Sequence, residues 1–200
     1  MKRAQIPYVT IFLIGMNVGI FLAIELLGST ADSDLMVRYG AMRMPEMLED
    51  HSYWRLFTSM FLHFGTGHII SNMVSLLVVG ISLEREEGSL RFALTYLISG
   101  VLGNVISLIY DHIMNINCIS AGASGAIYGV FGAMLVTEFV ISREKKKDLL
   151  RILCVGVLLF MWNDQKAGSV DYAAHLGGFL TGGLIQLVAM GLGRKKKGDE

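Results

Sequence analysis

The sequence has little charge and few prolines and cysteines. Only 17% of its 200 residues are charged, and it contains two prolines and two cysteines. Cys118 and Cys154 lack the spacing of a metal site or a disulfide framework, so we interpret both as small apolar residues. The apolar fraction is 53% and the mean hydropathy is +0.54. Soluble domains are roughly 45 to 50% apolar, so the composition predicts a membrane protein.

Six apolar segments occur along the chain, and a spanning helix needs about 20 residues. We therefore predict a single membrane domain over residues 1–200, with helices over 8–27, 67–83, 89–110, 124–142, 149–163 and 170–192. Lys2 and Arg3 before the first segment resemble the start of a signal peptide. That segment is longer than the usual apolar region of about 7 to 15 residues, and no cleavage site follows it, so we expect a retained helix.

The basic residues predict the orientation of the helices. With six spans, 13 of the 17 cations fall on the side of the termini and four on the other. The terminal-side cations are Lys2, Arg3, Arg85, Arg91, Arg143, Lys145, Lys146, Lys147, Arg151, Arg194, Lys195, Lys196 and Lys197, and the others are Arg38, Arg43, Arg55 and Lys166. Cytoplasmic loops are enriched in Lys and Arg, so we expect both termini in the cytoplasm, with the chain in the cell inner or plasma membrane.

The long connection over residues 28–67 is amphipathic rather than merely polar. Tyr53 and Trp54 beside Arg55 are typical of an element at the membrane interface, where aromatic rings and snorkelling cations are both favoured. We therefore predict that this first outer loop lies against the bilayer.

Polar residues inside apolar segments are costly in lipid and are functional candidates for that reason. Ser124 precedes Arg143 by 19 residues, and His175 precedes Arg194 by 19. Both therefore lie roughly 28 Å above the inner boundary, on helices that run in the same direction. His68 reaches a similar height by the same arithmetic. The polar candidates are Asn17, Glu25, His68, Asn72, Glu84, Asn104, Ser124, Tyr128, Asp171, His175 and Gln186.

A serine and a histidine at one depth are the minimum needed for nucleophilic acyl transfer, because the imidazole can take the hydroxyl proton and return it to the leaving amine. Ser124 opens a helix after residues 121–123, so first-turn amides are free to stabilise an oxyanion. His68 and Asn72 share a helix face and could add side-chain donors.

Two glycine pairs favour close approach of the helices that carry these residues. Gly125 and Gly129 are four apart on one helix, and Gly178 and Gly182 on another. Small residues at this spacing let membrane helices pack closely. Such pairs are also common in ordinary helix packing, and that interpretation stays open.

Taken together, these residues resemble the rhomboid family of intramembrane serine proteases. Five motifs occur in that family's order: Trp54-Arg55, His68-xxx-Asn72, Gly80-xxx-Glu84-xxx-Gly88, a GxSG signature at 122–125 followed by Tyr128, and AHxxGxxxG at 174–182. They extend over about two thirds of the chain. The resemblance implies an all-α, six-transmembrane-helix rhomboid bundle with a long amphipathic first outer loop.

The resemblance also implies residue roles and partners. Ser124 would be the nucleophile and His175 the base, with the oxyanion held by His68, Asn72 and the Ser124 amide. Substrates would be transmembrane proteins in the bilayer, and we expect no cofactor, metal or nucleic acid. Support around the active site would come from Gly122, Gly125 and Tyr128, and structural roles would fall to Trp54, Arg55, Glu84, Gly178 and Gly182.

Other residues in the sequence allow alternative interpretations. Asp171 lies four residues before His175, but the resembled family uses a dyad and we expect water to solvate this carboxylate, so we do not predict a triad. His51, His63 and His112 fall in the predicted outer loops without ligand spacing, so a zinc site is not expected. The rival functions are a rhomboid-like protein that binds membrane clients without cutting them, and a small transporter or proton channel.

Overall fold

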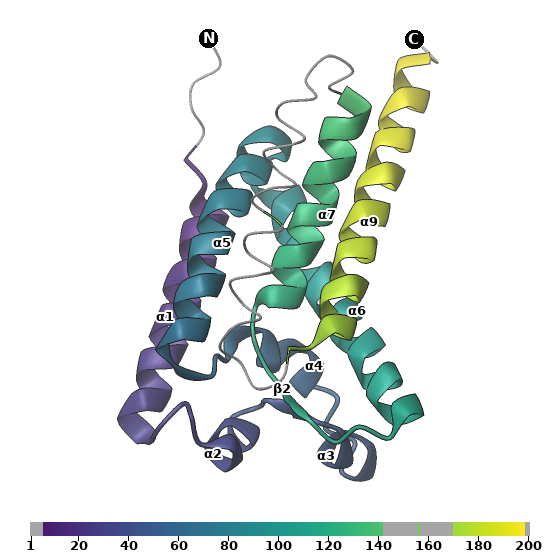
Figure 1. Ribbon diagram of the computed structural model, residues 1–200. Coiled ribbons are helices and arrows are strands. Elements are labelled where there is room, and N and C mark those ends of the chain that lie inside the picture. The colour runs from purple at the N-terminus through teal and green to yellow at the C-terminus, as the bar shows by residue number, and fades with distance from the viewer. Residues whose placement is uncertain (1–5, 142–155, 157–169, 199–200) are drawn as a thin grey trace.

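The computed structural model describes residues 6–141, 156 and 170–198. Within this part, long helices form a bundle with short elements gathered at one end (Figure 1). Helix α1 begins and α9 ends at the opposite end of the bundle (Figure 1). The bundle helices are α1 (Tyr8–Leu27), α5 (Gly65–Glu87), α6 (Ser89–Met114), α7 (Ser124–Ile141) and α9 (Tyr172–Gly198).

Four helices in the described part are long and apolar enough to cross a membrane. They are α1, α5, α6 and the Tyr172–Gly191 portion of α9. Helix α7 has 18 residues and packs among α5, α6 and α9. All of the predicted helix over 149–163 except residue 156 lies outside the described residues, so the count of six remains a prediction. The described chain is a helical membrane bundle.

Several helices continue past their predicted ends into charged sequence. Helix α5 extends from the predicted residue 83 to Glu87, and α9 from 192 to Gly198. The predicted ends followed the loss of apolar residues, whereas Glu, Lys and Arg are themselves good helix formers. Helix α6 ends only at Met114, where Asn115 takes a left-handed conformation with a φ of 53°.

The predicted first outer loop contains several short elements. Strand β1 (Met42–Arg43) pairs antiparallel with β2 (Ile119–Ser120), which lies just before α7. This ladder joins the loop to the segment that leads into α7 (Figure 1). The remaining elements are α2 (Ser33–Arg38), α3 (Met44–Glu49), α4 (Arg55–Thr58) and η1 (Ser59–Phe61).

Arg55 organises this loop from inside. Its guanidinium is buried and donates to the carbonyl oxygens of Val37 and Ala41 and to the hydroxyl of Ser52. The same guanidinium lies 4.7 Å from the centre of the Trp54 ring, which is half exposed. One planar cation thus joins two parts of the loop that are distant in sequence, and the loop is held in a defined conformation.

Glu84 joins α1, α5 and α6 at the opposite end of the bundle. This carboxylate is only 2% exposed, yet it accepts from the Val9 amide, the Thr10 amide and hydroxyl, and the Ser89 hydroxyl at 2.6 to 2.9 Å. The first amides of a helix have no partner within it, and Pro7 offers α1 no side-chain cap. Glu84 therefore caps α1 from a neighbouring helix.

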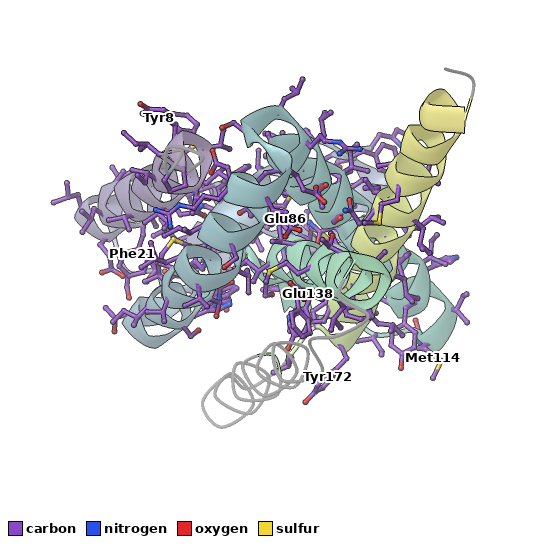
Figure 2. All side chains as sticks on the ribbon, turned by 90° about the horizontal axis from the view of Figure 1, so that it is seen from above. Tyr8, Phe21, Glu86, Met114, Glu138 and Tyr172 are labelled. Carbon is purple, nitrogen blue, oxygen red and sulfur yellow. The ribbon has the colours of Figure 1, made fainter. Side chains whose placement is uncertain are left out.

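Helix α7 lies near the centre of the bundle when the molecule is viewed along its axis (Figure 2). Its backbone meets that of α9 through glycines. A Cβ built on Gly178 would lie 2.0 Å from the carbonyl oxygen of Gly125, and one built on Gly182 would lie 1.9 Å from that of Gly129. Only glycine fits at these two positions of α9, so the pairing fixes how closely the two helices approach.

Candidate active site

Ser124 is the first residue of α7, and the segment before it is fixed by two hydrogen bonds. The Gly122 amide donates to the carbonyl oxygen of Ser59 at 2.9 Å, and the Ala123 amide donates to Nε2 of His63 at 3.3 Å. Both acceptors come from the first outer loop. The loop therefore sets where α7 begins, and with it the position of the Ser124 hydroxyl.

Gly122 has a conformation and surroundings that require glycine. Its φ is +139°, which L side chains rarely adopt. A Cβ there would lie 2.8 Å from Cε1 and 2.9 Å from Nε2 of His68, and 3.7 Å from the Ser124 hydroxyl. The His68 imidazole therefore lies directly beside the turn into Ser124.

His175 lies on the second turn of α9 and reaches Ser124. Its Nε2 is 2.7 Å from the Ser124 Oγ, a hydrogen-bond distance. The imidazole is 5% exposed and stacks on the Tyr128 ring, with 4.4 Å between ring centres and 24° between ring planes. Its Nδ1 has no protein hydrogen-bond partner within the described residues. The ring is thus held by its own helix and by the tyrosine, without a carboxylate.

His68 and Asn72 lie on α5 beside this pair. The Asn72 side-chain amide donates to the carbonyl oxygen of His68 at 2.9 Å, and His68 Nδ1 accepts weakly from the Phe64 amide at 3.4 Å. The Asn72 side-chain oxygen is buried without a partner in the described chain. Both residues are close to Ser124, but in this arrangement the Asn72 amide also serves its own helix.

A pocket opens between α5 and α7 and includes Ser124 in its wall. Its α5 wall is polar near the outer end, where Asn72 lies, and its α7 wall is aromatic. The Ser71 and Ser75 hydroxyls donate to backbone oxygens one turn earlier on α5, so the lining presents few free donors. Its full lining is Ser71, Asn72, Ser75, Val79, Ser124, Ile127, Tyr128, Phe131 and Gly156.

Asp171 is hydrogen-bonded to groups other than the His175 ring within the described residues. One carboxylate oxygen accepts from the Ser107 and Ser120 hydroxyls, both at 2.6 Å, and the other accepts from the Ala174 amide at 2.8 Å. No hydrogen bond between the carboxylate and the His175 ring is found in the described chain. Water was expected to solvate this carboxylate; it is half-buried, and the fold also brings two serine hydroxyls and a helix amide to it.

His63, which lies in the first outer loop between η1 and α5, also belongs to this site. Its ring is 1% exposed and lies 5.2 Å from the ring of His68. The five-residue spacing between these histidines was the only available signal. His112, also predicted in a loop, lies in the last turn of α6. The described residues contain no group of three or more His, Cys, Asp or Glu that could hold a metal.

The sequence of the chain is similar to those of known proteins. Residues 50–191 match the model of the Rhomboid domain. The chain is 39% identical over 161 residues to RHOMBOID-like protein 1 of Arabidopsis thaliana, covering 76% of this chain and 38% of that protein. It is 31% identical over 190 residues to Rhomboid protease GluP of Bacillus subtilis (strain 168), covering 93% of this chain and 35% of that protein.

A third relative is named as inactive, in contrast to the relative that is named as a protease. Inactive RHOMBOID-like protein 8 of Arabidopsis thaliana is 32% identical over 159 residues, covering 78% of this chain and 43% of that protein. The chain thus spans less than half the length of each of these three relatives. The extent of the family match and the apolar helices together lead to one assignment: this chain is an integral multi-pass membrane protein that belongs to the rhomboid family.

Proposed function

We propose that this chain is an intramembrane serine endopeptidase that cleaves transmembrane segments of other membrane proteins near the extracytoplasmic side. The observation that carries the proposal is the 2.7 Å separation between the Ser124 Oγ and the His175 Nε2. A buried imidazole at this distance is placed to act as general base toward a serine hydroxyl.

In the proposed reaction, Nε2 of His175 takes the Ser124 proton as Oγ bonds to the carbonyl carbon of the substrate. The tetrahedral intermediate collapses when the imidazolium gives that proton to the leaving amine, and the peptide C–N bond breaks. A water molecule, deprotonated by the same Nε2, then attacks the acyl-enzyme ester. Collapse of the second intermediate releases a carboxylic acid and returns the proton to Ser124.

The negative charge that develops on the substrate oxygen needs preorganised donors. The Ser124 amide is in the first turn of α7, where amides lack partners within the helix. His68 lies beside Gly122 and Asn72 lines the same pocket as Ser124, so both are assigned to the oxyanion as side-chain donors. Asn72 would exchange its bond to the His68 carbonyl for one to the substrate.

The surroundings of the dyad favour a membrane substrate. Ser124 and His175 lie near the starts of α7 and α9, which pack with α5 and α6 in a bundle that contains four candidate membrane-spanning helices. A peptide bond within a stable helix is shielded, so substrates whose transmembrane helices unwind easily near the outer surface fit this site best. No cofactor takes part in the proposed steps.

The proposed orientation places both termini in the cytoplasm of the cell inner or plasma membrane. The 13-to-4 distribution of cations supports it through the positive-inside rule. The start of α1 and the end of α9 lie at one end of the bundle, away from Ser124, which also favours it (Figure 1).

The test is cleavage of a model transmembrane substrate by the purified protein, with an activity-directed fluorophosphonate as an independent probe. Cleavage and labelling are expected in the parent and should both disappear in Ser124→Ala. His175→Ala should lose at least roughly 10³-fold, by analogy with serine proteases that lack a member of their catalytic group. Undiminished cleavage by Ser124→Ala would overturn the mechanism.

The second candidate function is client binding without cleavage. The 32% identity to a relative named inactive favours keeping it in view. It predicts that the parent protein captures transmembrane segments in liposomes yet shows neither cleavage nor fluorophosphonate labelling. A parent protein that is labelled at Ser124 excludes it.

A further inference from the structure

Asp171 joins three parts of the chain through one carboxylate. Its Oδ2 accepts from Ser107 on α6 and from Ser120 on β2, each at 2.6 Å. Its Oδ1 accepts from the Ala174 amide at 2.8 Å, which makes Asp171 the cap of α9. The segment before Ser124, the start of the His175 helix and α6 therefore meet at this side chain.

The Ser120–Asp171 hydrogen bond joins residues with the same sequence separation as the Ser124–His175 pair. Ser120 precedes Ser124 by four residues, and Asp171 precedes His175 by four. Both pairs are therefore 51 residues apart in sequence. The two chain segments that carry the dyad are thus joined by hydrogen bonds both at the reacting atoms and just before each helix begins.

We propose that Asp171 is a positioning residue that holds the His175 end of α9 in place against the segment leading into Ser124. This inference rests on the proposed function, because it concerns the geometry of the Ser124–His175 pair. It differs from a triad, in which the carboxylate would bond to the imidazole itself.

His175 depends on such support because its ring contacts with Tyr128 and with Tyr172 of its own helix do not hold the start of α9 in place. Its Nδ1 has no hydrogen-bond partner in the described chain, and Tyr128 restricts the ring plane but not the position of the helix along its axis. The residue before it, Ala174, places its carbonyl oxygen 2.7 Å from where a Cβ on Gly103 would lie. The first turn of α9 therefore packs closely against α6, and the hydrogen bond from Ser107 to Asp171 holds it there.

The hydrogen bond between Ser120 and Asp171, here called the bridge, also bears on the position of Ser124. Ser120 pairs with Met42 in the short β ladder, and the Gly122 amide bonds to Ser59, so the segment is already tied to the first outer loop. The hydroxyl of Ser120 adds its only described side-chain bond, which points to α9. Without Asp171, the nucleophile would stay fixed to the outer loop while the start of the helix that carries the base would lose its hydrogen bonds to α6 and to the segment before Ser124.

Three substitutions separate positioning from a direct electrostatic role. Asp171→Asn is isosteric and neutral: its oxygen still accepts from the Ala174 amide, and its NH₂ can donate to the serine hydroxyls. Asp171→Ser keeps a good helix cap but is too short to reach Ser107 and Ser120. Asp171→Ala removes both the cap and the bridge.

The experiment measures kcat, KM and the rate of fluorophosphonate labelling for these variants in the full chain. Displacement of catalytic groups by about 1 Å can cost 10²-fold, so Asp171→Ala and Asp171→Ser should lose roughly 10- to 100-fold in kcat with little change in KM. Asp171→Asn should stay within about fivefold of the parent, equivalent to about 1 kcal/mol of barrier. Melting temperatures are recorded for each variant, so that unfolding is not mistaken for lost positioning.

Ser120→Ala removes the same hydrogen bond from the other partner. The activity of the double variant Ser120→Ala, Asp171→Ala should therefore be no lower than that of Asp171→Ala alone. Ser82→Ala is the matched serine control, since Ser82 is exposed and its hydroxyl, within the described residues, donates to the Val78 carbonyl oxygen of its own helix. It should behave as the parent.

Two results would overturn the positioning role: full activity in Asp171→Ala, or Asp171→Asn as impaired as Asp171→Ala, which would assign the effect to charge on His175. In either case Ser124→Ala still abolishes labelling and the proposed function stands. A parent protein that is never labelled removes the proposed function, and the positioning role with it.

Discussion

Gly182 on α9 faces Gly129 on α7 backbone to backbone, and a Cβ on Gly182 would lie 1.9 Å from the Gly129 carbonyl oxygen. Helix backbones cannot yield as the tip of a side chain can. We therefore predict that Gly182→Ala pushes the helices apart and lowers stability by about 1–3 kcal/mol, the usual cost of overpacking. Activity should fall as well, because His175 moves with α9.

The measurements for this variant are thermal unfolding in detergent and cleavage of a model substrate. Gly191→Ala is the matched control on the same helix, because nothing lies within 4 Å of its added Cβ. Equal melting temperatures for the Gly182→Ala and Gly191→Ala proteins would show that the helices tolerate separation, contrary to this prediction.

Removal of the Glu84 carboxylate should loosen α1. The Glu84 carboxylate accepts four hydrogen bonds, two of them from the Val9 and Thr10 amides at the start of α1. Leaving buried donors without an acceptor costs about 1–3 kcal/mol each, so Glu84→Ala should lower the melting temperature clearly. Glu49→Ala, at an exposed position, should leave it unchanged. Faster proteolysis or amide exchange at the start of α1 is the specific signature, and its absence would contradict the capping role.

Arg55→Lys should destabilise the first outer loop although the charge is kept. The guanidinium bonds to two carbonyl oxygens and one hydroxyl at once and lies over the Trp54 ring. An ammonium group cannot reproduce this planar arrangement. We expect a lower melting temperature and lower activity, since the loop also holds the segment before Ser124. The control is Arg38→Lys, an exposed position that should show no change.

His63 should make the protein sensitive to acid. Burial, with a contribution from the nearby His68 imidazole, lowers the pKa of His63 from 6.5 to about 3. Between these values the unfolded chain binds a proton that the folded chain excludes, so stability is complete above about pH 6.5 and declines as the pH falls toward 3. The Ala123 amide, which donates to this ring, is one of the contacts at stake.

The test compares unfolding of the parent and of His63→Gln at pH 7 and pH 4.5. Glutamine retains an oxygen acceptor but does not titrate, so the loss of stability on acidification should be smaller in the variant. His112→Gln, at an exposed position, should lose as much stability on acidification as the parent does. An identical acid response in the parent and in His63→Gln would contradict the prediction.

Much of the architecture could be predicted from local sequence. Apolar segments of spanning length predicted α1, α5, α6 and α9, because lipid forces every backbone polar group to be satisfied within the segment. The ends of α5 and α9 were misplaced because charged residues with good helix propensity extend a helix beyond its apolar part. Matched depth and the family motifs indicated Ser124 and His175, but their contact at 2.7 Å depends on how α7 and α9 pack.

By itself, the sequence determined the membrane environment, the helical segments and the residue types able to carry acyl transfer, since these depend on composition and on spacing along one chain. The tertiary structure alone decided which polar groups meet: Asp171 with Ser107 and Ser120 rather than His175, and His63 with Ala123 rather than water. The physical reason is that hydrogen bonds between segments 51 to 64 residues apart depend on how helices pack, and packing is fixed by contacts that no single segment contains.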